Sequence, residues 1–190
     1  MTDASGSSRC VGAHVVSVGA DALHRFSKPP CAEIRLLAGL GVEGDAHCGA
    51  TVAHRSRVAR NASRPNLRQV HLLQTELFAE VARHGHRVGP GDLGENVSTT
   101  GVDLLALPVG TVLRLGEEAQ VRLTGLRNPC WQIDRFSDGL LALMRPRGAD
   151  RRIARKAGVM AVVERSGLVR AGDPLHVVLP SGPHRPLAVV

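Results

Sequence analysis

Apolar stretches in this chain are only a few residues long, and glycine or proline separates most of them. The longest, such as Val159 to Val163, fall far short of the roughly 20 residues that a membrane-spanning helix needs. They are rich in branched side chains, which pack well on a pleated sheet. We therefore expect a core built from short strands, and no contact with a membrane.

Strand-like composition recurs along the whole chain. The predicted strands are 11–18, 32–37, 68–73, 111–115, 120–126, 158–164 and 175–179. Apolar residues at helical spacing predict one helix from Thr75, as N-cap, to about His84, and a second from Asp138 to Met144. Because strands outnumber helices and do not alternate with them, we predict a mainly β fold: an antiparallel, barrel-like sheet with attached α-helices.

The length of 190 residues indicates one domain, large enough to bury about two-thirds of the surface that the unfolded chain exposes. Residues 1–10 are rich in serine and polar groups and are predicted to be a flexible tail, with a single domain over 11–190. The segment from Met1 to Arg9 lacks the apolar core of a secretory signal, so we predict a cytoplasmic protein.

The amino-acid composition limits which kinds of molecule this protein is expected to bind. Aromatic residues make up only 2% of the chain, which argues against a protein that stacks single-stranded nucleic acid on aromatic rings. The formal charge is nevertheless +7, and among the 24 basic residues only Lys28 and Lys156 are lysines. Codon bias toward arginine accounts for the larger share of this excess, and an anionic ligand or partner remains open for the rest.

None of the four cysteines, Cys10, Cys31, Cys48 and Cys130, lies in a C-x-x-C pair. This spacing excludes zinc ribbons and thioredoxin-type motifs. Cys130 has the most suggestive surroundings, because a predicted strand ends just before it, the Asn128-Pro129 turn fixes the backbone, and the guanidinium of Arg127 favours a thiolate. A thiolate attacks electrophiles or binds soft metals. A buried structural cysteine explains the same spacing equally well.

Two glycine-rich loops carry further polar groups. In the segment 91–96, Glu95 can accept hydrogen bonds from ring N–H groups and Asn96 can both donate and accept, although an ordinary polar turn is the favoured interpretation. The segment 44–48 contains His47 and Cys48, but a zinc site that also used His54 matches no standard spacing. A polar or anion-contacting loop fits better. No nucleophile elbow, Walker A motif or dinucleotide-binding glycine motif is present.

Taken together and in order, these segments resemble the MOSC domain, the module named for the C-terminal domain of molybdenum cofactor sulfurases. The resemblance extends from about Val11 to the C-terminus and is greatest for the small stand-alone bacterial members. The segments that carry it are Lys28, Gly41-Val-Glu-Gly44-Asp45-Ala-His47, Arg68-Gln-Val70, Gly94-Glu95-Asn96, Leu107-Pro-Val-Gly110, Gly125-Leu-Arg127-Asn-Pro-Cys130 and Gly172-Asp173.

The resemblance implies a β-rich, barrel-like fold that holds the molybdenum cofactor, molybdopterin, with Cys130 as both metal ligand and catalytic residue. The implied cofactor-binding residues are Lys28, His47, Arg68, Glu95, Asn96, Arg127 and Asn128. Basic groups suit the cofactor phosphate, and Glu95 and Asn96 suit the edge of the pterin ring. The histidine at position 47 departs from the arginine-bearing loop of the amidoxime-reducing relatives.

The implied activity is reduction of N-hydroxylated small molecules with electrons from an external donor, since the sequence shows no iron–sulfur or flavin module. The chain has no room for a pyridoxal phosphate domain. An alternative is a sulfur-carrier or cofactor-handling module, in which Cys130 holds a persulfide supplied by a cysteine desulfurase-type donor. A second alternative, a basic nucleic-acid-binding protein, is disfavoured by the scarcity of aromatic residues.

Overall fold

The computed structural model describes residues 12–51, 65–148 and 153–190. The strands are β1 (His14–Gly19), β2 (Pro30–Cys31), β3 (Glu33–Leu37), β4 (Gly41–Val42), β5 (Val70–Gln74), β6 (Val97–Thr100), β7 (Val112–Leu115), β8 (Ala119–Leu126), β9 (Val159–Arg165), β10 (Gly167–Arg170) and β11 (Leu175–Val178). The helices are α2 (Glu76–Ala82), α3 (Gln132–Phe136), α4 (Leu140–Met144) and the 3-10 turn η1 (Leu104–Ala106). No helix among the described residues is long and apolar enough to cross a membrane.

One eight-stranded sheet forms the body of the molecule, in the order β11-β7-β8-β9-β5-β6-β1-β2. Its neighbours are antiparallel except β5 and β6, which run parallel and are joined through α2. The sheet curls until β1 meets the segment before β11: the amide of Val15 donates to the carbonyl of Asp173 at 2.9 Å, and the amide of Gly172 donates to the carbonyl of Val15 at 2.8 Å. The predicted barrel-like, mostly antiparallel sheet is confirmed.

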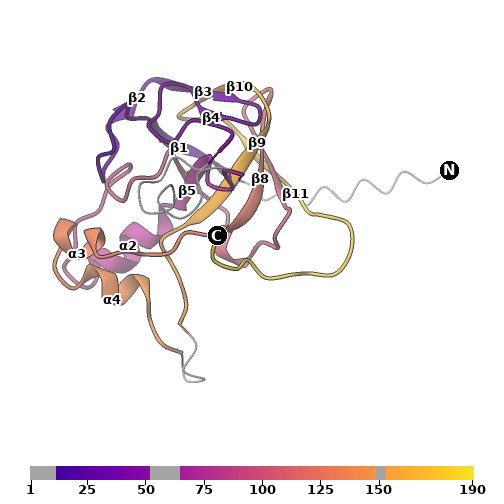
Figure 1. Ribbon diagram of the computed structural model, residues 1–190. Helices are drawn as coiled ribbons and strands as arrows, with labels where there is room; N and C mark the ends of the chain where they lie inside the picture. The colour runs from indigo at the N-terminus through magenta and orange to yellow at the C-terminus, as the bar shows by residue number, and fades with distance from the viewer. Residues whose placement is uncertain (1–11, 52–64, 149–152) are drawn as a thin grey trace.

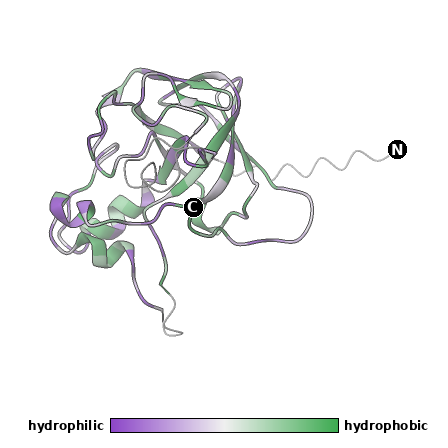
Figure 2. Ribbon diagram, viewed as in Figure 1, coloured by the Kyte–Doolittle hydropathy of each residue, from purple (hydrophilic) through white to green (hydrophobic). Residues whose placement is uncertain are grey.

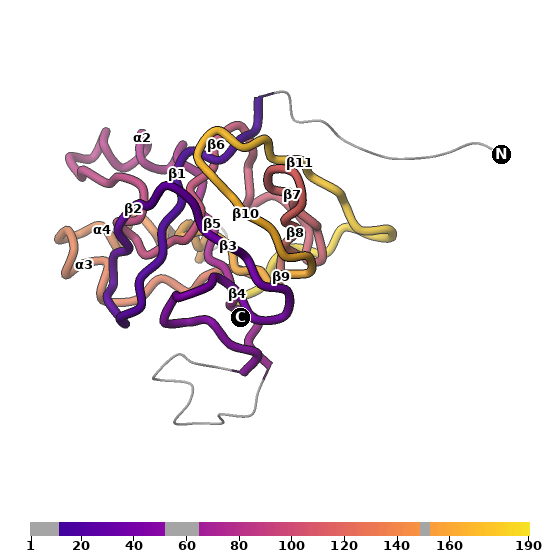
Figure 3. The backbone as a smooth tube through the Cα atoms, turned by 90° about the horizontal axis from the view of Figure 1, so that it is seen from above, coloured from indigo at the N-terminus to yellow at the C-terminus, as the bar shows by residue number. Residues whose placement is uncertain are grey.

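A second sheet of three strands, in the order β10-β3-β4, lies beside the first. Figure 1 and Figure 3 show the three helices gathered at one side of the curled sheet, away from β10 and β3. The larger apolar cluster belongs to the strands and includes Val15, Leu36 and Val121. The smaller cluster lies among the helices and includes Leu77 and Leu140. In Figure 2 the strands and α4 are largely green, the colour of hydrophobic residues.

Several element boundaries differ from the prediction. Helix α2 ends at Ala82 rather than near His84, and Thr75 makes no side-chain capping hydrogen bond. Helix α4 begins after Gly139, whose φ of +80° is incompatible with a right-handed helix at the position where the sequence predicted one. Strand β6, strand β10 and helix α3, each four or five residues long, were not predicted.

Candidate cofactor site

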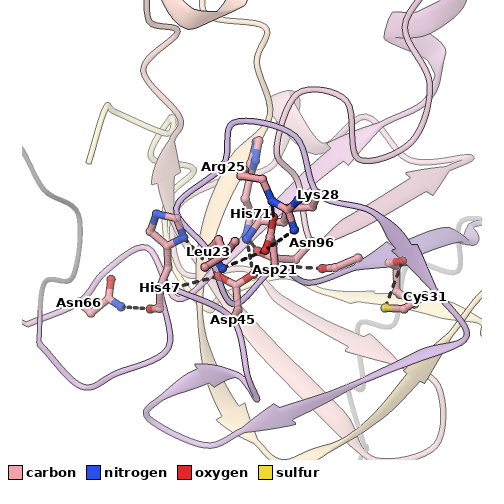
Figure 4. A network of polar contacts seen from close by, with 12 residues as sticks. Asp21, Leu23, Arg25, Lys28, Cys31, Asp45, His47, Asn66, His71 and Asn96 are labelled. Carbon is pink, nitrogen blue, oxygen red and sulfur yellow. Dashed lines mark hydrogen bonds and ion pairs between the residues drawn. The ribbon is translucent and has the colours of Figure 1, made fainter.

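A buried aspartate, Asp45, joins three of the predicted site residues. It lies in the loop after β4, where its Oδ1 accepts a hydrogen bond from the backbone amide of His47 at 2.9 Å. Its Oδ2 accepts one from Nδ2 of Asn96 at 3.0 Å and forms an ion pair with Nζ of Lys28. Figure 4 shows these side chains converging from three separate segments on one carboxylate. Asp45 therefore fixes the relative positions of Lys28, His47 and Asn96.

The Asp45 carboxylate is ionised. Burial raises its pKa, but the hydrogen bonds from His47 and the charge of Lys28 outweigh burial and hold the pKa well below its usual range. Asp21 lies in the same network: its backbone amide donates to Oδ2 of Asp45 at 3.3 Å, and its carboxylate pairs with Arg25. The charge of Lys28 is thus already compensated inside the protein, and contact between Lys28 and a cofactor phosphate stays a prediction.

The Gly94-Glu95-Asn96 segment leads into β6 and is held from two sides. The backbone amide of Asn96 donates to the carbonyl of His71 at 2.8 Å, and its Nδ2 donates to the carbonyl of Gly19 at 3.1 Å. Gly94 has a φ of +83°, and a Cβ there would collide with the carbonyl oxygen of Phe26. Glycine at this position therefore permits close approach of the chain's own 26–28 segment.

Glu95 is almost wholly buried, with 1% of its surface exposed. Its Oε1 accepts hydrogen bonds from the backbone amide of Gly91 at 2.7 Å and from Oγ of Ser98 at 2.9 Å. Its Oε2 is buried and has no hydrogen-bond partner among the described residues. Burial raises the pKa of Glu95 and outweighs these donors and the positive charge of Arg127.

Arg127 follows the last residue of β8 and turns its side chain inward. Its backbone amide donates to the carbonyl of Gly158 at 3.0 Å, and its guanidinium carbon lies 5.7 Å from the centre of the Phe26 ring. The guanidinium is buried, and its Nη1 has no partner among the described residues. Burial lowers the pKa of Arg127, while the nearby Cys130 and Glu95 oppose that shift. Arg127 thus lies close enough to interact electrostatically with both.

Cys130 is half-buried in the turn that precedes α3, with its Sγ 3.4 Å from Oε1 of Gln132. Beside it is a shallow pocket of about 220 Å³ lined by Phe26, Trp131, Gln132, Arg135 and Phe136. Three of the four aromatic residues of the whole chain line this one pocket. Trp131 is 61% exposed, and the guanidinium carbon of Arg135 lies 5.5 Å from its ring centre. Two of the residues that line the pocket, Trp131 and Gln132, directly follow Cys130 in the sequence.

The remaining two predicted site residues, Asn128 and Arg68, differ in their surroundings. Asn128 is exposed and accepts a hydrogen bond from Nε of Arg155 at 3.4 Å. Arg68 precedes β5, half-buried, and its backbone amide donates to Oδ1 of Asn66 at 3.0 Å. Burial, then the charges of Arg127 and Arg68, lower the pKa of the buried His71 far below its usual value. The charge of Arg68 therefore acts on the buried His71, whereas Asn128 faces the surface.

Sequence reasoning gave no separate role to Asp45, His71 or the aromatic pocket. The signal available for Asp45 was its place in a glycine-rich loop, where a buried carboxylate needs hydrogen-bond partners. Of the residues in the disfavoured zinc hypothesis, His54 lies outside the described residues. Within the described ranges, no group of three or more His, Cys, Asp or Glu side chains is arranged to hold a metal.

The fold is a curled β-sheet, and its site combines a thiol next in sequence to an aromatic pocket with a buried arginine whose charge acts on that thiol and on a buried glutamate. Residues 47–176 match the family model of the MOSC domain, which is well over half of the chain. The chain belongs to the MOSC domain family. This domain is associated in general with binding of the molybdenum cofactor.

Several solved structures share the fold of this chain. The YUAD protein from Bacillus subtilis is 23% identical, with a TM-score of 0.71 over 87% of this chain and 94% of that one. YiiM from Geobacillus stearothermophilus is 16% identical, with a TM-score of 0.61 over 92% of this chain and 79% of that one. YiiM from Escherichia coli is 22% identical, with a TM-score of 0.59 over 89% and 71%. No curated protein matches the sequence.

Proposed function

We propose that this protein binds the molybdenum cofactor and reduces N-hydroxylated small molecules with electrons from an external donor. The observation that carries the proposal is that Oε2 of Glu95 and Nη1 of Arg127 are two of the three buried side-chain polar atoms without a partner among the described residues, the third being Oγ1 of Thr99. Buried polar atoms are almost always hydrogen-bonded, so an unpaired carboxyl oxygen and an unpaired guanidinium nitrogen, the latter on a side chain whose charge acts on Cys130, are what a missing polar ligand would leave.

The residues present fit that cofactor. Cys130 offers the soft sulfur ligand that molybdenum prefers, and Arg127 offers a donor for an anionic or carbonyl group. Glu95 and Asn96 lie at the loop that would face the edge of the pterin ring. Arg68 adds positive charge for the phosphate. When bound, the molybdenum centre supplies two-electron redox chemistry.

The chain's own residues bind the substrate and stabilise the charge of the Cys130 sulfur. The aromatic pocket of Phe26, Trp131 and Phe136 holds the substrate beside Cys130, and Arg127 stabilises negative charge at the sulfur. The net reaction consumes two electrons and two protons, breaks the N–O bond of a hydroxylamine and releases an amine and water. In this proposal an external donor supplies the electrons.

The deciding experiment expresses the protein in a host that makes the cofactor and measures molybdenum and released pterin per chain. Reduction of an N-hydroxylated amidine with a chemical electron donor is then compared between wild type and Cys130→Ser. Reduction that depends on both molybdenum and Cys130 is the expected result. A protein that carries no molybdenum, or that reduces the amidine equally well as Cys130→Ser, would refute the proposal.

A second function is supported by the half-exposed position of Cys130 beside a positive charge, which also suits a sulfur carrier. In that case a cysteine desulfurase-type donor would transfer sulfur to the thiolate and leave a persulfide. The test incubates metal-free protein with such a desulfurase and cysteine, and measures the mass added to the chain. Stoichiometric persulfide on Cys130, together with no reduction by any donor, would favour this function over the reductase.

A further inference from the structure

The two oxygens of the buried Glu95 carboxyl group are in very different surroundings. Both donors that reach the side chain, the Gly91 amide and the Ser98 hydroxyl, bind Oε1. Oε2 is equally buried, yet no donor among the described residues reaches it. An ionised carboxylate shares its charge over both oxygens and gains from donors at each, whereas a neutral acid has one accepting oxygen and one O–H group.

The surroundings also lack a close counter-charge. Within the described residues, no ion pair involves Glu95, in contrast to Asp45, which pairs with Lys28. Arg127 is the charged side chain whose field acts on Glu95, and its guanidinium is itself buried. An unpaired buried carboxylate is costly, and proteins usually avoid it by keeping such a group protonated.

We propose that Glu95 is a neutral carboxylic acid whose Oε2–H group donates a hydrogen bond to an acceptor atom of the bound ligand. This inference deepens the proposed function and rests on it for the identity of the ligand. It reverses the role that the sequence suggested, in which Glu95 accepts hydrogen bonds from ring N–H groups. The matching ligand atom is then a ring nitrogen or carbonyl oxygen, and Arg127 Nη1 is a second donor nearby.

The protonation state is measured on the metal-free protein by infrared spectroscopy. A protonated carboxyl group has a carbonyl stretch that is separate from the carboxylate and amide bands and shifts in heavy water. At neutral pH we expect this band in wild type and its loss in Glu95→Gln. Glu118→Gln is the matched control, because the side chain of Glu118 is 64% exposed, and it must leave the band unchanged. Absence of the band from wild type would overturn the proposal.

The donor role is measured by the pterin that each variant retains after purification from a cofactor-making host. Glutamine keeps a neutral N–H donor and an accepting oxygen, so Glu95→Gln should retain about as much pterin as wild type. Glu95→Ala removes the donor and should retain less by on the order of tenfold. A loss in Glu95→Gln as large as in Glu95→Ala would overturn the donor role. If wild type carries no pterin, the proposed function fails, while the infrared result still decides the state of Glu95.

Discussion

Cys130 differs from the other described cysteines in what surrounds its sulfur. It lies within the field of Arg127, whereas burial raises the pKa of both Cys31 and Cys48, and the charges of Asp45 and Glu43 raise that of Cys48 further. A raised pKa favours the thiol, which neither binds metal nor attacks electrophiles well. We therefore predict that Cys130→Ser loses bound molybdenum while Cys31→Ser and Cys48→Ser keep it, as measured by metal content per chain.

Cys10 lies outside the described residues, and its serine variant belongs in the same series. All four variants should unfold at similar urea concentrations, so that a loss of metal is not mistaken for a loss of fold. Retention of metal by Cys130→Ser combined with its loss from Cys48→Ser would show that the wrong cysteine was assigned.

Asp45 is the residue whose loss should most disturb the loops of the site. In Asp45→Asn the buried Lys28 loses the carboxylate with which it forms an ion pair, and breaking a buried pair in this way costs about 3–5 kcal/mol in the free energy of unfolding. Urea unfolding at neutral pH measures this loss. Lys28→Met in the Asp45→Asn background removes the uncompensated charge and should recover part of it. Full stability in Asp45→Asn would mean that the ion pair does not stabilise the fold.

The same carboxylate predicts a dependence on pH. Its pKa is lowered in the folded protein from the ordinary 3.8, so its stabilising contribution is complete above about pH 4 and is lost as the pH falls toward the folded value. Between pH 5 and pH 3, wild type should therefore lose stability more steeply than Asp45→Asn. Urea midpoints measured across this range test the prediction, and parallel slopes for the two proteins would contradict it.

Trp131 is a large apolar side chain that the fold leaves 61% exposed at the pocket next to Cys130. If it holds a planar substrate by stacking, Trp131→Ala should raise KM for an aromatic N-hydroxylated substrate by on the order of tenfold, with a much smaller effect on an aliphatic one. Steady-state kinetics with both substrates make the comparison. Leu179→Ala, at another exposed apolar position, is the control and should change neither KM.

At the scale of elements, the sequence predicted those strands in which apolar and polar residues alternate or branched side chains are frequent. Strands β7 and β8 match the predicted ranges 111–115 and 120–126 closely, because buried and exposed residues alternate along both strands. They pair as a hairpin with Leu115 opposite Ala119. Strand β10 was placed in a connecting segment, since Gly167 opens it and only four residues form it. Its pairing with β3 depends on a neighbour distant in sequence, and such pairing leaves no local pattern to detect.

For the candidate site, as for the strands, the sequence indicated residues that have a local signal but not the contacts between distant residues. Glu95, Arg127 and Cys130 stood out because their residue types sit at glycine-rich or proline-rich turns. The link from Asp45 to Asn96 could not be seen, because it joins side chains 51 positions apart through one hydrogen bond. Neither could the aromatic pocket, since Phe26 reaches Trp131 and Phe136 only through the fold.

Strand β8 is held near the site by the C-terminal segment. The amide of Leu126 donates to the carbonyl of Ala188 at 2.7 Å, and a Cβ on Gly125 would collide with that carbonyl and with the side chain of Val190. We predict that Gly125→Ala destabilises the fold by about 1–3 kcal/mol through overpacking, and lowers cofactor retention by shifting Arg127. Urea unfolding and pterin content measure the two effects.

Gly89→Ala is the matched control, because a Cβ there meets only Oδ2 of Asp92 at an ordinary contact distance of 3.6 Å. Its stability should stay close to that of wild type. Equal stability of Gly125→Ala and Gly89→Ala would show that the C-terminal segment moves aside without cost.

For the whole molecule, the two apolar clusters are coupled through β5. Leu72 points into the cluster of the curled sheet and its neighbour Leu73 into the cluster of the helices. We therefore predict that the domain over 11–190 unfolds in one cooperative transition. Far-ultraviolet circular dichroism follows the sheet, and the fluorescence of Trp131, the single tryptophan, follows the helical side. Two separated midpoints would indicate that the clusters unfold independently.

The hydrogen bonds between Val15 and the 172–173 segment also set an order of events during synthesis. The ribosome synthesises Val15 early and Gly172 late. Strand β1 therefore lacks the hydrogen bonds to the 172–173 segment until most of the chain has been translated. Phe26 and Lys28 follow β1 directly, and their final positions depend on that strand. The loops that surround Cys130 can take their places only after the late segment has emerged. Loading of any large cofactor therefore belongs after translation, on a chain that has already closed its sheet.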